Sequence, residues 1–174
     1  MGYITINELS DSLVQYLNDL TKMSNGNTTS RCVDNNTDEC SSAGSLVNDA
    51  YSSNGQVYML KSNGSVNNVY TGQFNNMKFG NYSLCMRIKI SDNSSASTVL
   101  TASIKNGGTT LLSKQIAGNV FKTASDYCYL YTTFEYEGSN NGALTFELNT
   151  ASVSGVDIYF DYAYISLITP AIYI

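Results

Sequence analysis

Two glutamates separated by one residue, Glu135 and Glu137, are the side chains in this sequence whose spacing best suits catalysis. They lie in DYCYLYTTFEYEG (126–138), which alternates like a β-strand, so they share one face about 6.5–7 Å apart. Carboxylates in such a pair can hydrolyse a glycosidic bond. Arg87 and Lys89 have the same spacing on another predicted strand, and if the two strands are neighbours the charges form cross-strand ion pairs. We favour this structural role and predict no catalytic residue.

The composition excludes several other kinds of chemistry. The chain of 174 residues contains no histidine, so imidazole-based triads and metal sites are excluded. We find no Gly-x-Ser-x-Gly elbow, Ser-x-x-Lys box, P-loop or dinucleotide-binding glycine pattern. The net charge is −5 and no run of basic residues occurs, which argues against nucleic-acid binding. The sequence therefore predicts a protein that is not an enzyme and has no nucleic-acid partner.

Tyrosine is the side chain most suited to binding a ligand, because the chain has 14 tyrosines and no tryptophan. In 126–138, alternating tyrosines point away from the face that holds Leu130 and Phe134. An exposed aromatic row usually binds something, and a tyrosine offers a sugar both a flat apolar ring and a hydroxyl group. The alternative is that the linker, the helix or a second subunit covers the row. The candidate glycan-binding residues are Tyr127, Tyr129, Tyr131, Glu135, Arg87 and Lys89.

The strands that must hold these side chains are predicted from residue 46 onwards. Alternation and turn residues indicate strands at 56–60, 65–74, 81–91, 126–138, 142–149 and 156–168, and a hairpin at 97–116 that turns at Asn106-Gly107. In 81–91, one face holds Tyr82, Leu84, Met86, Ile88 and Ile90, and the other holds Ser83, Cys85, Arg87 and Lys89. In the last strand, one face holds Ile158, Phe160, Tyr162 and Tyr164. These patterns predict a mainly β protein, an antiparallel β-sandwich of the jelly-roll kind.

A single α-helix is predicted before the sandwich, in ITINELSDSLVQYLNDLTKM (4–23). Thr5 and Glu8 form a capping box, and Asn25-Gly26 ends the helix. A helix this short is marginal in water, so its apolar stripe needs a partner. It either packs on its own domain or joins a short bundle or a larger assembly. The stripe has heptad spacing and comprises Ile6, Leu9, Leu13, Tyr16, Leu20 and Met23.

The chain thus divides into four segments and contains four cysteines. Residues 1–24 hold the helix for assembly or anchoring, 25–45 are a polar linker or long surface loop, 46–168 form the sandwich, and 169–174 are an apolar C-terminal tail. Neither a C-x-x-C pair nor a histidine is present to hold zinc. The cysteines, which are Cys32, Cys40, Cys85 and Cys128, are all reduced, or a disulfide joins Cys32 to Cys40.

The order GNYSLCMRIKIS, YLYTTFEYEG, ALTFELN, VDIYFDYAYIS resembles the galactose-binding-like jelly roll of carbohydrate-binding modules. The resemblance covers about residues 46–168 and includes a Gly-x-Tyr strand and a final Asp-Tyr-x-x-Ile strand. In that family calcium often lies between the start of the sandwich and its last strand, which implies Asp161 with Asp49 as its partner. The family's glutamates at the first strand are missing here. The alternative is that Asp161 hydrogen-bonds to the backbone and that the protein has no cofactor.

The overall layout resembles phage virion proteins, such as tail fibres, baseplate proteins and capsid decorations. On this basis we expect a non-enzymatic virion structural or adhesion protein whose jelly-roll head binds host cell-surface carbohydrate. Its partners would be other virion subunits and copies of itself, with a trimer favoured. The N-terminus has no signal peptide and no segment predicts a membrane span, so we expect synthesis in the host cytoplasm. The alternatives are a free or enzyme-appended carbohydrate-binding module and a purely structural particle protein.

Overall fold

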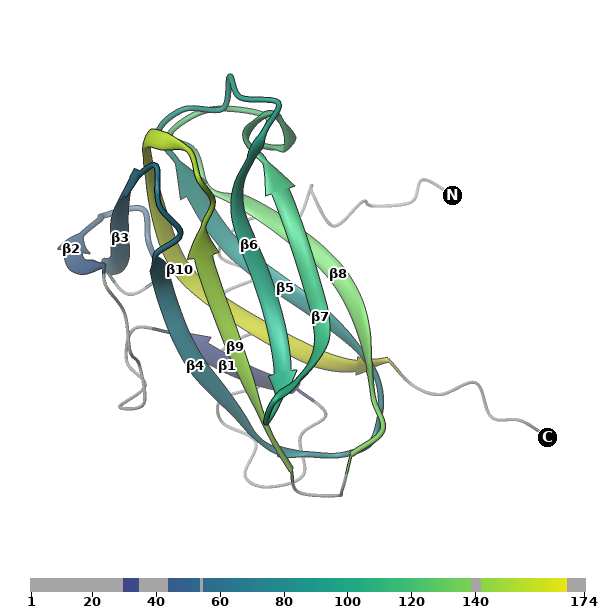
Figure 1. The fold of residues 1–174 in the computed structure, drawn as a ribbon. Coiled ribbons are helices and arrows are strands. Elements are labelled where there is room, and N and C mark those ends of the chain that lie inside the picture. The colour runs from purple at the N-terminus through teal and green to yellow at the C-terminus, as the bar shows by residue number, and fades with distance from the viewer. Residues whose placement is uncertain (1–29, 35–43, 54, 139–141, 169–174) are drawn as a thin grey trace, which may run out of the picture.

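The computed structural model describes residues 30–34, 44–53, 55–138 and 142–168, which form two antiparallel sheets packed face to face (Figure 1). This arrangement confirms the predicted mainly β sandwich. The predicted helix with its heptad residues, Cys40 of the proposed disulfide and the C-terminal tail lie outside the described residues. Within the described ranges, no helix is long and apolar enough to cross a membrane.

Each sheet mixes strands from distant parts of the chain, as a jelly roll requires. The larger sheet has six strands in the order β2–β3–β10–β5–β8, with β1 also paired to β10. Its strands are β1 (Ser30–Asp34), β2 (Ser45–Asn48), β3 (Gln56–Asn63), β5 (Gly80–Ile90), β8 (Cys128–Tyr136) and β10 (Ser154–Ile168). The smaller sheet has the order β4–β9–β6–β7, with β4 (Asn68–Met77), β6 (Thr98–Asn106), β7 (Thr109–Ala117) and β9 (Gly142–Thr150).

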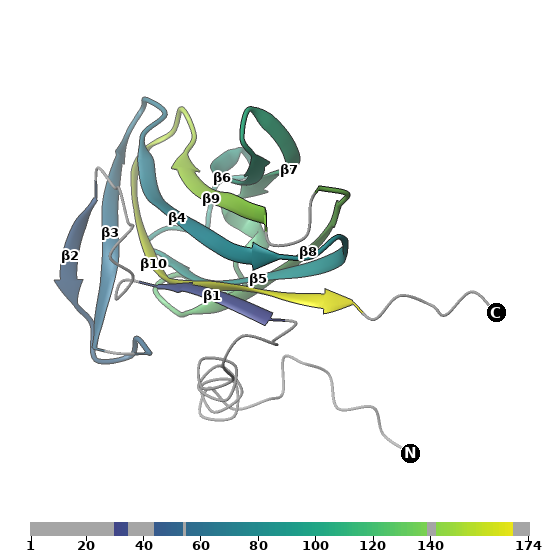
Figure 2. The same cartoon turned by 90° about the horizontal axis from the view of Figure 1, so that it is seen from below.

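Strand β1 lies inside segment 25–45, which the sequence predicts to be a polar linker or surface loop. It pairs antiparallel with the second half of β10, with Ser30 opposite Ser166 and Asp34 opposite Tyr162. Strand β3 pairs with the first half of β10 (Figure 2). Backbone hydrogen bonds hold such an edge strand, so a sequence pattern of apolar residues does not reveal it.

The core lies between the sheets, and it confirms the alternation predicted for β5. Every inward residue of that strand is buried: Tyr82, Leu84, Met86, Ile88 and Ile90. Aromatic rings join the two layers, since the Phe160 ring lies 4.5 Å from the Tyr70 ring and 5.7 Å from the Phe146 ring, measured between centroids. Burying each such side chain contributes about 1.5–3 kcal/mol of transfer free energy.

A β-bulge in β10 overturns the prediction that Tyr162 and Tyr164 share a face with Ile158 and Phe160. Phe160 lies opposite Ile88 and Tyr162 lies opposite Arg87, so Asp161 is an extra residue with no partner in the ladder with β5. The extra residue reverses the alternation. Beyond it the inward, core residues are Ala163 and Ile165, and the two tyrosines belong to the outer face.

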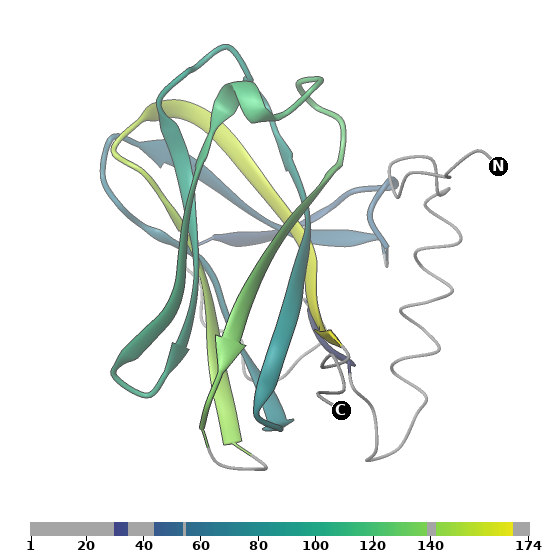
Figure 3. The same ribbon diagram turned by 90° about the vertical axis from the view of Figure 1, so that its right-hand side faces the viewer.

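The two sheets are joined on one side by the segment from β7 to β8. Strands β6 and β7 form the predicted hairpin, in which Gly107 has a φ of +56°, a conformation that glycine adopts easily in a tight turn. A short 3₁₀ helix, η2 (Gly118–Val120), then leads towards β8 (Figure 3). Strands β7 and β8 are edge strands of opposite sheets, and among the described strands none pairs with the outer edge of either one.

Candidate functional site

The outer face of the six-stranded sheet carries a group of tyrosines around Arg87. Residues that lie opposite each other in an antiparallel ladder point to the same side of the sheet. Arg87 on β5 lies opposite Tyr129 on β8 and Tyr162 on β10, and Cys85 has two further tyrosines opposite it. We call this group the tyrosine face; its members are Tyr127, Tyr129, Tyr131, Tyr159, Tyr162 and Tyr164.

The Arg87 side chain is buried and ion-paired with Asp161, the residue at the bulge. The Asp161 carboxylate also accepts hydrogen bonds from the Ser53 backbone N–H, at 3.1 Å to Oδ2, and from the Ser53 hydroxyl, at 2.8 Å. Arg87 Nη2 donates to the Tyr51 carbonyl oxygen at 2.9 Å. Two strands and the loop between β2 and β3 therefore meet at one buried ion pair.

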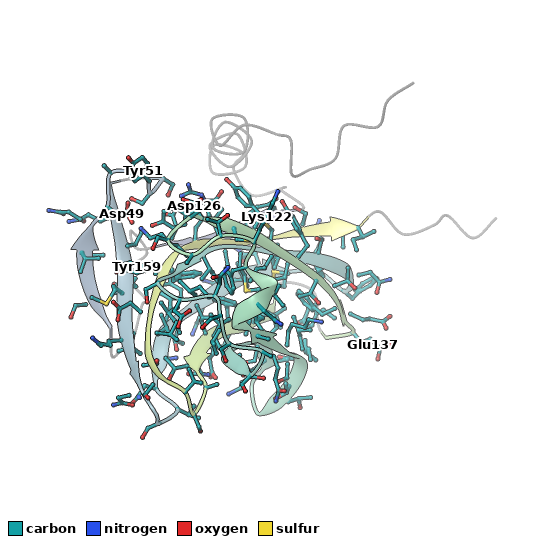
Figure 4. The ribbon with its side chains drawn as sticks, turned by 90° about the horizontal axis from the view of Figure 1, so that it is seen from above. Asp49, Tyr51, Lys122, Asp126, Glu137 and Tyr159 are labelled. Atoms are coloured by element: carbon teal, nitrogen blue, oxygen red, sulfur yellow. The ribbon has the colours of Figure 1, made fainter. Side chains whose placement is uncertain are left out.

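A second ion pair, Lys89 with Asp49, lies beside the first. The Asp49 carboxylate accepts hydrogen bonds from the Tyr127 hydroxyl and the Tyr51 backbone N–H, each at 2.9 Å. Figure 4 shows Asp49, Tyr51 and Tyr159 on the same side of the molecule. The Asp49 contacts fasten the β2–β3 loop onto the tyrosine face.

The two cations stack on the tyrosine rings as well as pairing with the aspartates. The Arg87 guanidinium carbon lies 4.0 Å from the centroid of the Tyr127 ring and 5.9 Å from that of Tyr129. Lys89 Nζ lies 4.9 Å from the Tyr127 centroid and 4.5 Å from the Tyr159 centroid. All four distances suit cation–π attraction, so Arg87 and Lys89 fix the orientation of these rings.

The titration behaviour of the network follows from burial and from its partners. Burial would raise the pKa of the Asp49 carboxyl, but hydrogen bonds from Lys89, Tyr51 and Tyr127 outweigh burial and leave the pKa below its ordinary value. Burial raises the pKa of the Asp161 carboxyl, although Ser53 and Arg87 act in the opposite direction. Burial and the hydrogen bond to Asp49 raise the pKa of the Tyr127 hydroxyl, so it stays a donor.

The tyrosine face is covered unevenly. Tyr162 is buried, whereas Tyr131 is 39% exposed. Tyr129 and Tyr164 are half-buried. Tyr127 and Tyr159 are half-buried as well, and their rings stack on Arg87 and Lys89. Tyr131, which lies opposite Cys85, is therefore the most exposed ring of the tyrosine face.

Cys85 is fully buried between Tyr131 and Tyr164. Burial raises the pKa of its thiol to about 11, and hydrogen bonding with the two tyrosine hydroxyls only partly opposes this. The thiol stays protonated near neutral pH and contributes packing rather than reactivity.

Glu135 does not join Arg87 and Lys89, contrary to the interpretation that these charges form cross-strand pairs. The strands β5 and β8 are indeed neighbours, but Glu135 lies opposite Asn81, whereas Arg87 lies opposite Tyr129. Six residues of strand, about 20 Å, separate Glu135 from Tyr129. Glu137 lies beyond the end of β8, far from Asp49 (Figure 4).

The residues that the family resemblance suggested for calcium do not fit that ion. Asp49 and Asp161 are each paired with a cation, and Asp161 also accepts the Ser53 backbone N–H. The described part of the chain has no cluster of three or more histidine, cysteine or acidic residues. A calcium ion would have to displace Arg87 and Lys89 from carboxylates that are already neutralised.

The comparisons with known proteins identify a fold. The sequence matches no protein-family model and no curated protein. Among solved structures, the CBM36-1 domain of a multidomain xylanase from the hindgut metagenome of Trinervitermes trinervoides is similar, with a TM-score of 0.54 and 16% identity. The similarity covers 80% of this chain and 98% of that domain. The fold is a carbohydrate-binding-module-like β-sandwich.

Two further solved modules support the same fold. The C-terminal CBM6 of LamC, a marine laminarinase from Zobellia galactanivorans, gives a TM-score of 0.51 at 15% identity over 79% of this chain and 98% of that one. The xylan-binding module CBM15 gives 0.52 at 13% identity, over 82% of this chain and 98% of that one. At these identities the likeness shows the fold alone. None of these three is a virion protein, so the expected place on a phage particle stays a prediction.

Proposed function

We propose that this chain is a non-catalytic carbohydrate-binding module that holds a glycan against the accessible part of its tyrosine face. The observation that carries the proposal is the row of reachable rings, Tyr129, Tyr131 and Tyr164, around one point of a single sheet face. A tyrosine ring can pack its flat apolar surface against the C–H surface of a sugar. The likeness of fold to a xylan-binding module supports the proposal.

The charges around the face suggest a neutral glycan. Arg87 and Lys89 are matched one to one by Asp161 and Asp49, so the centre of the face carries no net charge. An anionic polysaccharide such as polygalacturonate would find no unpaired cation in this network. In this proposal Arg87 and Lys89 position the tyrosine rings and do not donate hydrogen bonds to the sugar. Their role is thus indirect, whereas the sequence analysis placed them among the glycan-binding residues.

The test is a binding measurement with the full chain. We expect calorimetric titration to detect binding to a neutral polysaccharide from a panel of xylan, laminarin, galactan and mannan, and none to polygalacturonate. Tyr129→Ala and Tyr131→Ala each weaken binding by about tenfold, or 1.4 kcal/mol. Phe79→Ala is the matched control, because Phe79 is 63% exposed but precedes β5, at the end remote from Arg87. Failure to bind any polysaccharide, or equal binding by all the variants, would refute the proposal.

A second proposal concerns assembly and rests on the heptad spacing of residues 6–23. We propose that this stripe joins copies of the chain, or the chain to a larger particle such as a virion. Leu13→Asp places a charge on the stripe and Asn18→Asp places one off it. Light scattering after size exclusion should show an oligomer for the natural chain and Asn18→Asp, and a monomer for Leu13→Asp. A monomeric natural chain would exclude self-assembly.

A further inference from the structure

A cavity of about 100 Å³ opens at the side of the sandwich where β7 and β8 flank the core. It reaches the surface, because two of its lining residues, Val120 and Tyr131, are 55% and 39% exposed. The lining is completed by core and edge residues of both sheets: Met86, Lys114, Gln115, Ile116, Leu130 and Thr132. Figure 3 looks onto this side, with η2 above it.

The cavity has an apolar base and a polar mouth. Met86 and Ile116 are buried core residues, and Leu130 packs against the same core. Lys114 lies opposite Ala102, a core residue, so it occupies an inward position of β7 at an exposed edge. A charged side chain at an inward position is one way in which proteins protect an edge strand from pairing, and here it also puts a hydrogen-bond donor beside apolar walls.

The size of the cavity limits what can enter it. For comparison, an apolar cavity of about 150 Å³ holds one benzene molecule. At about 100 Å³ this cavity is too small for a whole sugar ring and large enough for a substituent of a few heavy atoms. Because Tyr131 belongs both to the cavity and to the tyrosine face, a sugar ring stacked on Tyr131 would lie next to the opening.

We propose that the cavity binds the acetyl group of an acetylated sugar whose ring packs on Tyr131, an inference that rests on the glycan-binding function proposed above. The acetyl methyl group lies among Met86, Ile116 and Leu130, where it replaces water against apolar walls. The acetyl carbonyl oxygen stays at the mouth, where the Lys114 ammonium group donates a hydrogen bond to it. A bare methyl group has no oxygen that could accept the hydrogen bond from Lys114. The polar mouth of the cavity therefore favours an acetyl group.

The experiment compares neutral glycans that carry acetyl groups with matched glycans that do not. The full chain is titrated with acetylated xylan and with the same xylan after alkaline deacetylation, and separately with chitohexaose and cellohexaose. We expect the acetylated member of at least one pair to bind about tenfold more tightly, or by 1.4 kcal/mol. Equal affinity within both pairs would overturn the acetyl site while leaving glycan binding intact. If none of the four glycans and no polysaccharide of the earlier panel binds, both proposals fail together.

Two variants at exposed positions test the acetyl site without removing a side chain from the core. Val120→Trp narrows the mouth at an exposed position, and Lys114→Met removes the donor. Each should abolish the preference for the acetylated glycan, whereas Val66→Trp, 65% exposed in the loop before β4, should retain it. A preference that survives both variants would overturn the proposal. So would tighter binding of a fucosylated oligosaccharide than its unfucosylated parent with no effect of acetylation, because the occupant would then be a methyl group.

Discussion

The Asp161 carboxylate, at the bulge of β10, is ion-paired with Arg87 on the neighbouring strand β5, 74 positions away in the sequence. The bulge allows this pair, because Asp161 is an extra residue in the ladder and points to the outer face together with Tyr162. The same pair holds the β2–β3 loop through Ser53 and Tyr51. Asp161, the extra residue at the bulge, therefore links Arg87 and the β2–β3 loop at the centre of the tyrosine face.

Replacing Arg87 should destabilise the fold strongly. The Arg87 and Asp161 side chains are 5% and 0% exposed, so Arg87→Met leaves a buried carboxylate without its cation. Breaking a buried pair in this way costs about 3–5 kcal/mol. Urea unfolding should show this loss, and Arg87→Met with Asp161→Leu should recover part of it, because no charge is then left buried.

The control for this prediction is another ion pair across a ladder, Lys105–Glu147, which joins β6 to β9 at 2.7 Å. It is partly exposed, so Lys105→Met should cost only about 0.2–1 kcal/mol. Equal losses of unfolding free energy for the Lys105 and Arg87 variants would mean that the buried ion pair stabilises the fold no more than an exposed one.

Asp49 should make stability depend on pH in the acid range. Its folded pKa lies below the ordinary value, because hydrogen bonds from Lys89, Tyr51 and Tyr127 outweigh the effect of burial. A lowered carboxyl pKa stabilises the fold above the unfolded pKa of about 3.9, and the contribution disappears as pH falls through the folded pKa. Asp49→Asn should lower Tm at neutral pH, and its difference from the natural chain should shrink between about pH 5 and pH 2.

Asp126→Asn, at an exposed position, serves as the control for the acid titration. Its Tm should follow that of the natural chain at every pH. If the Tm difference of Asp49→Asn were constant with pH, the ion pair with Lys89 would not be the source of the effect.

Cys85 should resist alkylation in the folded protein. It is fully buried, and burial raises the pKa of its thiol to about 11, so little thiolate forms at pH 8. Peptide mapping after iodoacetamide treatment at about pH 8 should find Cys85 unmodified, and modified once urea unfolds the chain. Labelling in the native protein as fast as that of free N-acetylcysteine would show that β5 is not buried as described.

Regular strands were the part of this fold that the sequence predicted well. In β5 and β8 every second side chain enters the core, so alternation reveals both the strand and its faces; Leu84 and Phe134 are examples. The reversal in β10 also leaves a signal. Its apolar residues fall at Ile158 and Phe160 and then at Ala163 and Ile165, a shift of one position that marks the bulge.

The partners of the charged residues could not be predicted in the same way. Lys89 pairs with Asp49, 40 positions earlier, although β3 and β10 lie between β2 and β5 in the sheet. The β2–β3 loop brings Asp49 to Lys89, and no local sequence pattern shows where that loop lies. The spacing of Arg87 and Lys89 matched that of Glu135 and Glu137, but the register between β5 and β8 separates the two sets. Register depends on turns and packing across the whole sheet, which no local pattern records.

Tyr131 should bind sugar through its ring rather than its hydroxyl group. The hydroxyl is engaged with the Cys85 thiol and with Tyr164 inside the sheet face, while 39% of the residue is exposed. With the polysaccharide that the natural chain binds, Tyr131→Phe should keep affinity within about twofold, and Tyr131→Ala should lose about tenfold. Affinity electrophoresis can rank the three proteins in one gel. If Tyr131→Phe lost as much affinity as Tyr131→Ala, the hydroxyl group would be the sugar contact, and the ring-stacking account of the tyrosine face would be wrong.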